Sequence, residues 1–378
     1  MRNRILVALV ATVAVGGAVA LVALLSDGGD EGIPARTAGG AEAGPPATGH
    51  QGVIRGTIWV ANEGSGSLSA IDASTNAVIA TLTGIEGPHN LQVAPDGRSV
   101  WAVSGHESLA VAVDARTYEL LGTVPTGKEP AHVVLTPDGS MAYTTNSTDD
   151  TVSAIDTSAM RVIATIRVGD FPHGLRPSPE GKWVYVANTG GTTVSVIDTE
   201  SNREVGRIRV GERPVQVGFS PDGRFAYVSL NAEDAVGKID VERRRLVDTV
   251  RVGAGPVQVY VSPDSAFLLV ANQGTAEDPS TTVSIIDTAT FSVTATLETG
   301  MGAHGIVIEP SSRHAYITNI YGGDVAVIDL VEGRVVATIP VGLEPNGISF
   351  SPLEPAPAAS EIQLPMPILD DDMGDMDH

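Results

Sequence analysis

The sequence predicts an all-β protein, a seven-bladed β-propeller of four-stranded blades, closed by the last inner strand joining the first blade. Three landmarks repeat along the chain at spacings of 42 residues, with one interval of 47. A Pro-Asp-Gly-like turn begins at Pro95, Pro137, Pro179, Pro221, Pro263, Pro310 and Pro352. An aspartate preceded by Ile or Val stands at Asp72, Asp114, Asp156, Asp198, Asp240, Asp287 and Asp329. A third series, seven residues before each turn, is Pro88, Pro130, Pro172, Pro214, Pro256, Ala303 and Pro345. Because three independent landmarks share one period and one insertion, the chain is a tandem repeat.

Each repeat contains four short stretches with the alternation of β-strands. In the unit that covers 173–210, a short apolar stretch ends at a turn, and three stretches of alternating apolar and polar residues follow. Val, Ile, Thr and Tyr fill these positions, as pleated strands prefer. Four strands in about 42 residues are typical of one propeller blade.

The two ends of the repeat region complete one blade. Thr57–Asn62 matches a second strand with no inner strand before it, and Asn346–Ser351 matches an inner strand with no followers. Pairing between them leaves no open sheet edge in the ring. We expect two columns to fill the space between blades: Trp59, Trp101, Tyr143, Tyr185, Tyr227, Leu269 and Tyr316 from second strands, and Ile71, Val113, Ile155, Ile197, Ile239, Ile286 and Ile328 from third strands.

Three segments carry a family resemblance: Val184–Asn188, Val194–Asp198 and Phe171–Gly174. They resemble the YVTN-type bacterial propeller repeat, and the resemblance covers about 57–352. It implies a seven-bladed fold like that of lactonases and haem d1-domain propellers. Its relatives include surface-layer and secreted binding propellers, lactonases, and haem- or quinone-dependent oxidoreductases, among which the fold alone does not choose.

The segments outside the repeats differ in composition. Arg2 and Arg4 precede an apolar run of 21 residues, 5–25, which predicts either an uncleaved membrane anchor or a signal peptide cleaved after Ala18-Val19-Ala20. Both alternatives place the propeller on the extracytoplasmic face of the membrane, with a single N-terminal span, or secreted if cleaved. The predicted domains are the anchor or signal peptide at 1–25, a flexible Gly/Ala/Pro linker at 26–52, the propeller at 53–355, and a disordered acidic Met/Asp/His tail at 356–378.

Composition excludes several classes of function. The net charge of −22, with only 23 Lys and Arg, disfavours binding to a nucleic acid. The chain has no cysteine, so disulfides, thiol nucleophiles, thiolate metal sites and covalent c-type haem are excluded. No nucleophile elbow, phosphate loop or His-Glu-x-x-His pair occurs.

Unusual polar residues gather at one face of the predicted ring. Strand direction alternates within a blade, so the loops that enter inner strands and the loops that join second to third strands lie on one face, here called the mouth face. The candidate ligand-binding residues at this channel mouth are His89, Asn90, His132, His173, Gln216, Gln258, His304 and Asn346.

Three interpretations of these residues stay open. They are turn residues inherited with an ancestral blade and bonded to backbone, or a funnel for a small polar ligand or a protein, or a metal site that uses His89, His173 and His304. Against a metal site, a seven-stranded channel suggests that histidines on non-adjacent blades lie too far apart. Met373, Met376 and His378 form a second candidate metal site in the tail.

The predicted function is therefore an extracytoplasmic binding or scaffold module that acts through the channel mouth. Its partner is an unknown protein or a small polar ligand, with the membrane contacted through 5–25. No cofactor is predicted beyond a possible metal ion. The alternative is a lactonase-like hydrolase or a metal-dependent oxidoreductase that uses the histidines.

Overall fold

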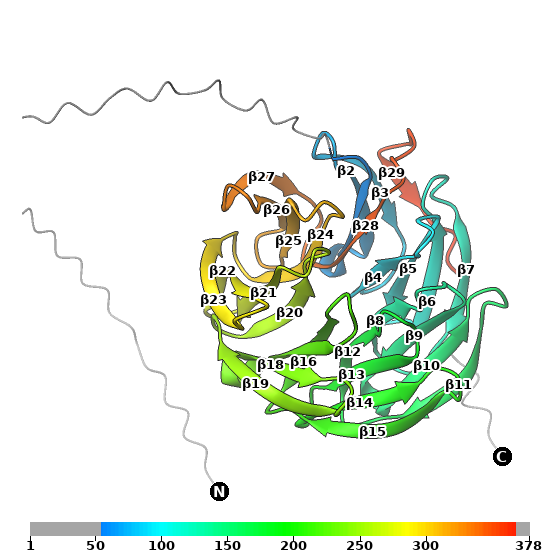
Figure 1. Cartoon of the computed structure of the whole chain (residues 1–378). Helices are drawn as coiled ribbons and strands as arrows, with labels where there is room; N and C mark the ends of the chain where they lie inside the picture. Colours follow the sequence, from blue (N-terminus) through cyan, green and yellow to red (C-terminus); the bar gives the residue numbers. More distant parts are fainter. Residues whose placement is uncertain (1–53, 368–378) are drawn as a thin grey trace, which may run out of the picture. The chain divides into compact units, whose positions relative to one another are not determined.

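The computed structural model describes residues 54–367 and forms a ring of seven antiparallel-paired sheets around a central channel (Figure 1). The innermost strands are β4 (Leu91–Val93), β8 (Pro130–Leu135), β12 (Pro172–Pro177), β16 (Pro214–Phe219), β20 (Pro256–Val261), β24 (Ala303–Ile308) and β28 (Pro345–Ser351). The second strands are β1 (Thr57–Asn62), β5 (Ser99–Ser104), β9 (Met141–Asn146), β13 (Trp183–Asn188), β17 (Phe225–Leu230), β21 (Phe267–Gly274) and β25 (His314–Asn319).

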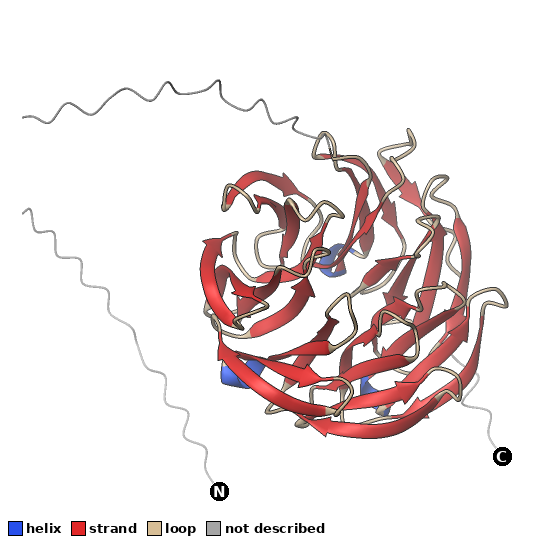
Figure 2. Ribbon diagram, viewed as in Figure 1, coloured by secondary structure: helices blue, strands red, loops and turns tan. Residues whose placement is uncertain are grey.

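The outer half of each blade repeats the same order. The third strands are β2 (Ser67–Asp72), β6 (Leu109–Asp114), β10 (Thr151–Asp156), β14 (Thr193–Asp198), β18 (Ala235–Asp240), β22 (Pro279–Asp287) and β26 (Asp324–Asp329). The fourth strands are β3 (Ala77–Thr83), β7 (Leu120–Pro125), β11 (Arg161–Arg167), β15 (Arg203–Arg209), β19 (Arg245–Arg251), β23 (Ser292–Glu298) and β27 (Arg334–Pro340). Helix within 54–367 is confined to three 3-10 turns (Figure 2), η1 (Glu63–Ser65), η2 (Ser147–Asp149) and η3 (Asn231–Glu233). The predicted all-β, seven-bladed fold is confirmed.

The ring is closed as the sequence predicts. β28 pairs antiparallel with β1, with Thr57 opposite Ser351 and Trp59 opposite Ser349. The first blade therefore contains strands from both ends of the repeat region, in the order β28-β1-β2-β3-β29.

The strand β29 (Glu361–Gln363) corrects the predicted domain boundary at 355. It pairs in parallel with β3 at the outer edge of the first blade (Figure 1), and Leu364 beyond it is only 2% exposed. The Tyr118 hydroxyl donates a hydrogen bond to the carbonyl of Ala356 at 3.0 Å. The prediction of a disordered tail from 356 is thus wrong for the segment up to 367. The segment has few apolar residues, so its composition did not indicate packing. Its backbone pairs with the free edge of β3, and its apolar side chains join the apolar cluster of the first two blades.

The hydrophobic core lies between blades. Both predicted columns are buried, and each of the seven apolar clusters in the described part of the chain combines side chains of two or three neighbouring blades. Trp101 of the second blade, for example, shares a cluster with Leu135 and Ile155 of the third. Each blade is held by its neighbours, as wedge-shaped packing requires.

The seven aspartates that end third strands fix the following turns. Each accepts a hydrogen bond from a backbone N–H two or three residues ahead, as in Ser74 N–H to Asp72 Oδ1 at 2.8 Å. Such a bond replaces the ladder bond that the strand end lacks. A structural role common to all blades accounts for this series.

The predicted N-terminal span at 5–25 and the linker at 26–52 lie outside the described residues. Between 54 and 367, no helix has both the length and the apolar character that crossing a bilayer requires.

Candidate functional site

The candidate residues line the start of the inner strands, where the ladder is irregular. The pairing of inner with second strands skips a residue in the same place in six blades, for example between Pro130 and Val133 and between Pro172 and Leu175. A β-bulge of this kind turns a side chain that would otherwise face the neighbouring blade. His132 and His173 occupy different registers of their blades, yet their ring centroids lie 4.7 Å apart.

A hydroxyl from the second strand holds three of these six bulges. Thr145 Oγ1 accepts a hydrogen bond from the His132 backbone N–H at 3.1 Å and donates one to the His173 carbonyl at 2.7 Å. Ser229 makes the same pair of contacts to Gln216 N–H and Val257 O, and Thr318 makes it to Gly305 N–H and Asn346 O. Thr145, which is fully buried, therefore fixes the backbone of two histidines on different blades.

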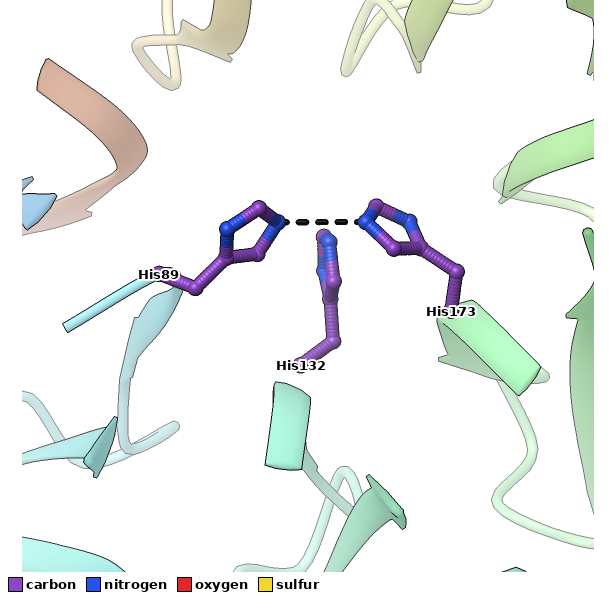
Figure 3. Close-up of side chains that lie close together, drawn as sticks. All are labelled: His89, His132 and His173. Atoms are coloured by element: carbon purple, nitrogen blue, oxygen red, sulfur yellow. Dashed lines mark hydrogen bonds between the residues drawn. The ribbon is translucent and has the colours of Figure 1, made fainter. Parts of the chain in front are cut away.

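The structure brings four histidines together at the channel mouth. The ring centroid of His89 lies 5.5 Å from that of His132, 5.1 Å from that of His173 and 6.1 Å from that of His304. Figure 3 shows the first three rings pointing toward one another, and one potential ligand atom from each lies within 4.8 Å of the others. The expectation that histidines on non-adjacent blades lie too far apart is wrong, because the ring centroids of His89 and His173, which are two blades apart, lie only 5.1 Å from each other. The inner strands that carry His132, His173 and His304 each contain a bulge at that position.

Hydrogen bonds fix the proton positions on two of the rings. His89 Nδ1 lies 2.9 Å from Glu63 Oε2 and 2.9 Å from Asn346 Nδ2. We assign the proton to Nδ1, because a carboxylate only accepts and the Asn346 amide has its own acceptor in Glu63 Oε2. His173 Nδ1 lies 3.3 Å from the carbonyl oxygen of Val215, which also only accepts. In neutral rings both Nε2 atoms then bear lone pairs. These two atoms face each other at 3.1 Å (Figure 3).

Burial keeps the other rings uncharged. Burial, with the charges of neighbouring histidines, lowers the pKa of His173 and of His304 to about 3. Burial also holds the pKa of His132 well below its ordinary value. Within 54–367, neither His132 Nε2 nor His304 Nδ1 has a hydrogen-bond partner. The mouth thus presents neutral imidazoles with unused nitrogen atoms.

Glu63 is the site residue that the sequence analysis missed. Burial opposes its ionisation, but the hydrogen bond and charge of His89 and the bond from Asn346 lower its pKa to about 2. A signal existed in the repeat: 84, 126 and 168 residues later, the same register holds Ser147, Thr189 and Asn231. Each of these donates a side-chain hydrogen bond to the carbonyl of the landmark proline 25 residues ahead. Glu63 replaces that contact with a carboxylate directed at His89.

The four predicted amide residues have separate partners. Asn346 Nδ2 donates to Glu63 Oε2 at 2.8 Å, and Gln216 Nε2 lies 3.4 Å from His132 Nδ1. Asn90 Oδ1 accepts from Val133 N–H, and Gln258 Nε2 donates to Ile306 O. Asn346 and Gln216 therefore contact the histidine cluster, whereas Asn90 and Gln258 join neighbouring inner strands. Met373, Met376 and His378 lie outside the described residues.

The histidine cluster stands between two cavities. A cavity of about 670 Å³ opens on the mouth face, and Glu63, His89, His173 and His304 line its floor together with the insertion segment Gln273–Asp278. A second cavity of about 410 Å³ lies deeper in the channel, and His132 lines it. A ligand bound to the histidine cluster is accessible from both cavities.

Comparisons with known proteins agree with this architecture. Residues 99–190 match the family model described as YNCE-like beta-propeller. The resemblance to YVTN-type propellers is confirmed. No curated protein matches the chain.

Solved structures extend the likeness to the whole ring. Hydrazine synthase of Kuenenia stuttgartiensis is 27% identical, with a TM-score of 0.65 over 71% of this chain and 91% of that one. A candidate 6-phosphogluconolactonase of Bacteroides fragilis is 18% identical, with a TM-score of 0.67 over 79% and 98%. The dihydro-haem d1 dehydrogenase NirN is 15% identical, with a TM-score of 0.59 over 78% and 74%. The last two likenesses concern the fold alone.

Proposed function

We propose that this protein is an extracytoplasmic binding propeller whose channel mouth holds a late first-row transition-metal ion, zinc or copper. The observation that carries the proposal is the pair of facing Nε2 atoms of His89 and His173 at 3.1 Å, whose Nδ1 protons are already committed. Two lone pairs repel at this distance unless a cation lies between them. A proton shared between these two Nε2 atoms leaves His132 Nε2 without a partner, whereas a metal ion can also bind His132 Nε2.

The surroundings of the histidines support a metal ion. Ligating histidines usually donate their other N–H to a carboxylate or a backbone carbonyl, which orients the ring, and Glu63 and Val215 O serve these two roles. Neutral imidazole suits zinc and copper.

Three protein ligands leave a coordination position open, as in metal sites that bind a further ligand. The 670 Å³ cavity above His89 and His173 is of the size that small-molecule ligands occupy. The proposed ligand is accordingly a small polar molecule that completes the coordination of the ion. The same open position supports the second candidate, a hydrolase that activates a metal-bound water.

The extracytoplasmic location rests on the sequence alone. Arg2 and Arg4 precede the apolar run 5–25, and positive residues before such a run stay on the cytoplasmic side. Tagged full-length chain should be cleaved by protease added to intact spheroplasts, and a variant lacking 2–25 should be protected. Equal protection of both chains would contradict this location.

Metal analysis tests the proposed site. Purified chain, dialysed after loading with zinc or copper, should retain about one ion per chain, and His89→Gln with His173→Gln should lose it. His106→Gln is the matched control, because His106 is an exposed histidine on the same face outside the cluster. Metal content that is equal in the double variant and the control would overturn the proposal.

A further inference from the structure

One level of the inner strands forms a ring of side chains below the histidines. The same register places these residues around the channel: Gln92, Val134, Arg176, Gly218, Tyr260, Val307 and Ser349. All except Gly218 line the deeper cavity of about 410 Å³. Arg176 is the only charged residue among them.

Arg176 has no counter-charge in the described part of the chain. Its guanidinium forms neither an ion pair nor a hydrogen bond with any residue of 54–367, and no Asp or Glu lines the cavity. Burial lowers the pKa of Arg176, and the charge acting in the opposite direction comes from the Tyr260 phenol. Arg176 is part-buried in the channel, and a part-buried cation without a partner carries a desolvation cost that no other residue of 54–367 offsets.

Two other residues that line this cavity offer donors with their acceptor atoms already occupied. Gln92 Oε1 accepts from Leu135 N–H at 3.0 Å, which leaves the Gln92 amide N–H groups unused. Ser349 Oγ accepts from Val93 N–H at 3.1 Å, which leaves its hydroxyl proton unused. The Tyr260 hydroxyl has no hydrogen-bond partner among residues 54–367. A cavity that combines one unpaired cation with several free donors complements an anion with several acceptor oxygens.

We propose that the deeper channel cavity binds a small oxyanion, a phosphate, a sulfate or a carboxylate, through the Arg176 guanidinium. Gln92, Tyr260 and Ser349 supply further hydrogen bonds to its oxygens. The cavity volume of about 410 Å³ admits a small anion and excludes a polymer. The net charge of −22 repels anions in general, so an anion that binds here does so through this local site. The proposal is independent of the metal ion.

Anion-dependent thermal stability tests the site. In Tris chloride buffer, added sodium phosphate, sulfate or succinate should raise the Tm of the metal-free chain in a saturable way for at least one anion. Arg176→Gln should abolish that increase. Arg116→Gln, which removes an exposed arginine far from the channel, should preserve it. Arg176→Met should raise the Tm in anion-free buffer, since it removes the unpaired charge.

The proposal would be overturned by no saturable increase in Tm with any of the three anions, or by equal increases in the wild type and Arg176→Gln. Increases that sodium chloride reproduces in full would also overturn it, because screening rather than recognition then explains them. His89→Gln with His173→Gln should keep the anion response. That variant separates the two sites, since failure of the metal site leaves this response unchanged.

Discussion

Thr145→Val provides the sharpest test of how the fold positions the histidines. The Thr145 hydroxyl satisfies the N–H of His132 and the carbonyl of His173, and valine keeps the branched shape without either bond. Each buried polar group left without a partner costs about 1–3 kcal/mol. With two groups affected, the free energy of unfolding should fall by roughly 2–6 kcal/mol, measured by urea unfolding of the metal-free chain.

The functional effect of this substitution should exceed its structural effect. Because the two freed backbones carry proposed ligands from different blades, zinc affinity by isothermal titration calorimetry should fall about tenfold or more, as it does when a group that orients a metal ligand is removed. Ser229→Ala breaks the same pair of bonds at Gln216 and Val257, so it should lower stability by a similar amount but weaken zinc binding less than Thr145→Val, because it frees the backbone of no histidine. Thr145→Ser should restore both properties. The reasoning is refuted if Thr145→Val binds zinc as tightly as the wild type, or if Ser229→Ala weakens zinc binding equally.

Three further predictions concern other parts of the molecule. Glu63→Gln should weaken zinc affinity about 10- to 100-fold in the same calorimetric assay, because it removes the carboxylate that orients His89; unchanged affinity would exclude that role. Leu364→Ala should cost about 2–5 kcal/mol in urea unfolding, because the side chain is 2% exposed in the cleft of the first blade; a cost near zero would mean that the segment after 355 does not pack. The metal-free chain should lose stability as the pH falls from about 6.5 toward 3, since its unfolded histidines bind protons that His173 and His304, with pKa values of about 3, do not. Glu63 adds to this loss between about pH 4.5 and 2, because its folded pKa is the lower one. His173→Gln should flatten the dependence between pH 6.5 and 3, and an unchanged slope would contradict the assigned protonation.

The fold was predictable from the sequence because its determinants are local and occur seven times. A turn signal, a strand-ending aspartate and an apolar column each recur in every blade, so an error in one unit is corrected by the others. The closure between β28 and β1 followed from counting strands. The packing of Leu364 did not follow, because it occurs once and rests on an apolar cleft that forms only after the first blade has folded.

The candidate site was predictable only in part. The histidine positions were visible, but their convergence depends on β-bulges, and no residue type in the inner strands marks a bulge. Thr145 resembles an ordinary strand residue until its two backbone partners are known. Glu63 and Arg176 were visible as departures from their registers, since Ser147 and Thr189 stand where Glu63 does and Val134 and Gly218 stand where Arg176 does. Comparing the residues at one register position across the blades therefore identifies both Glu63 and Arg176 from the sequence.

The same comparison weighs inheritance against function in the histidine cluster. A turn histidine copied with an ancestral blade needs one ring nitrogen bonded to backbone, and His173 Nδ1 has that bond to Val215 O. Inheritance thus explains the anchored nitrogen of His173. It does not explain why His89 is anchored instead by a carboxylate that occurs in no other blade at this register, nor why the free Nε2 atoms of the two rings meet at 3.1 Å. The bonds from His89 and Asn346 offset the desolvation cost of this part-buried carboxylate. A carboxylate bonded to one ring nitrogen orients the other nitrogen toward a ligand, which is the arrangement that the proposed metal site uses.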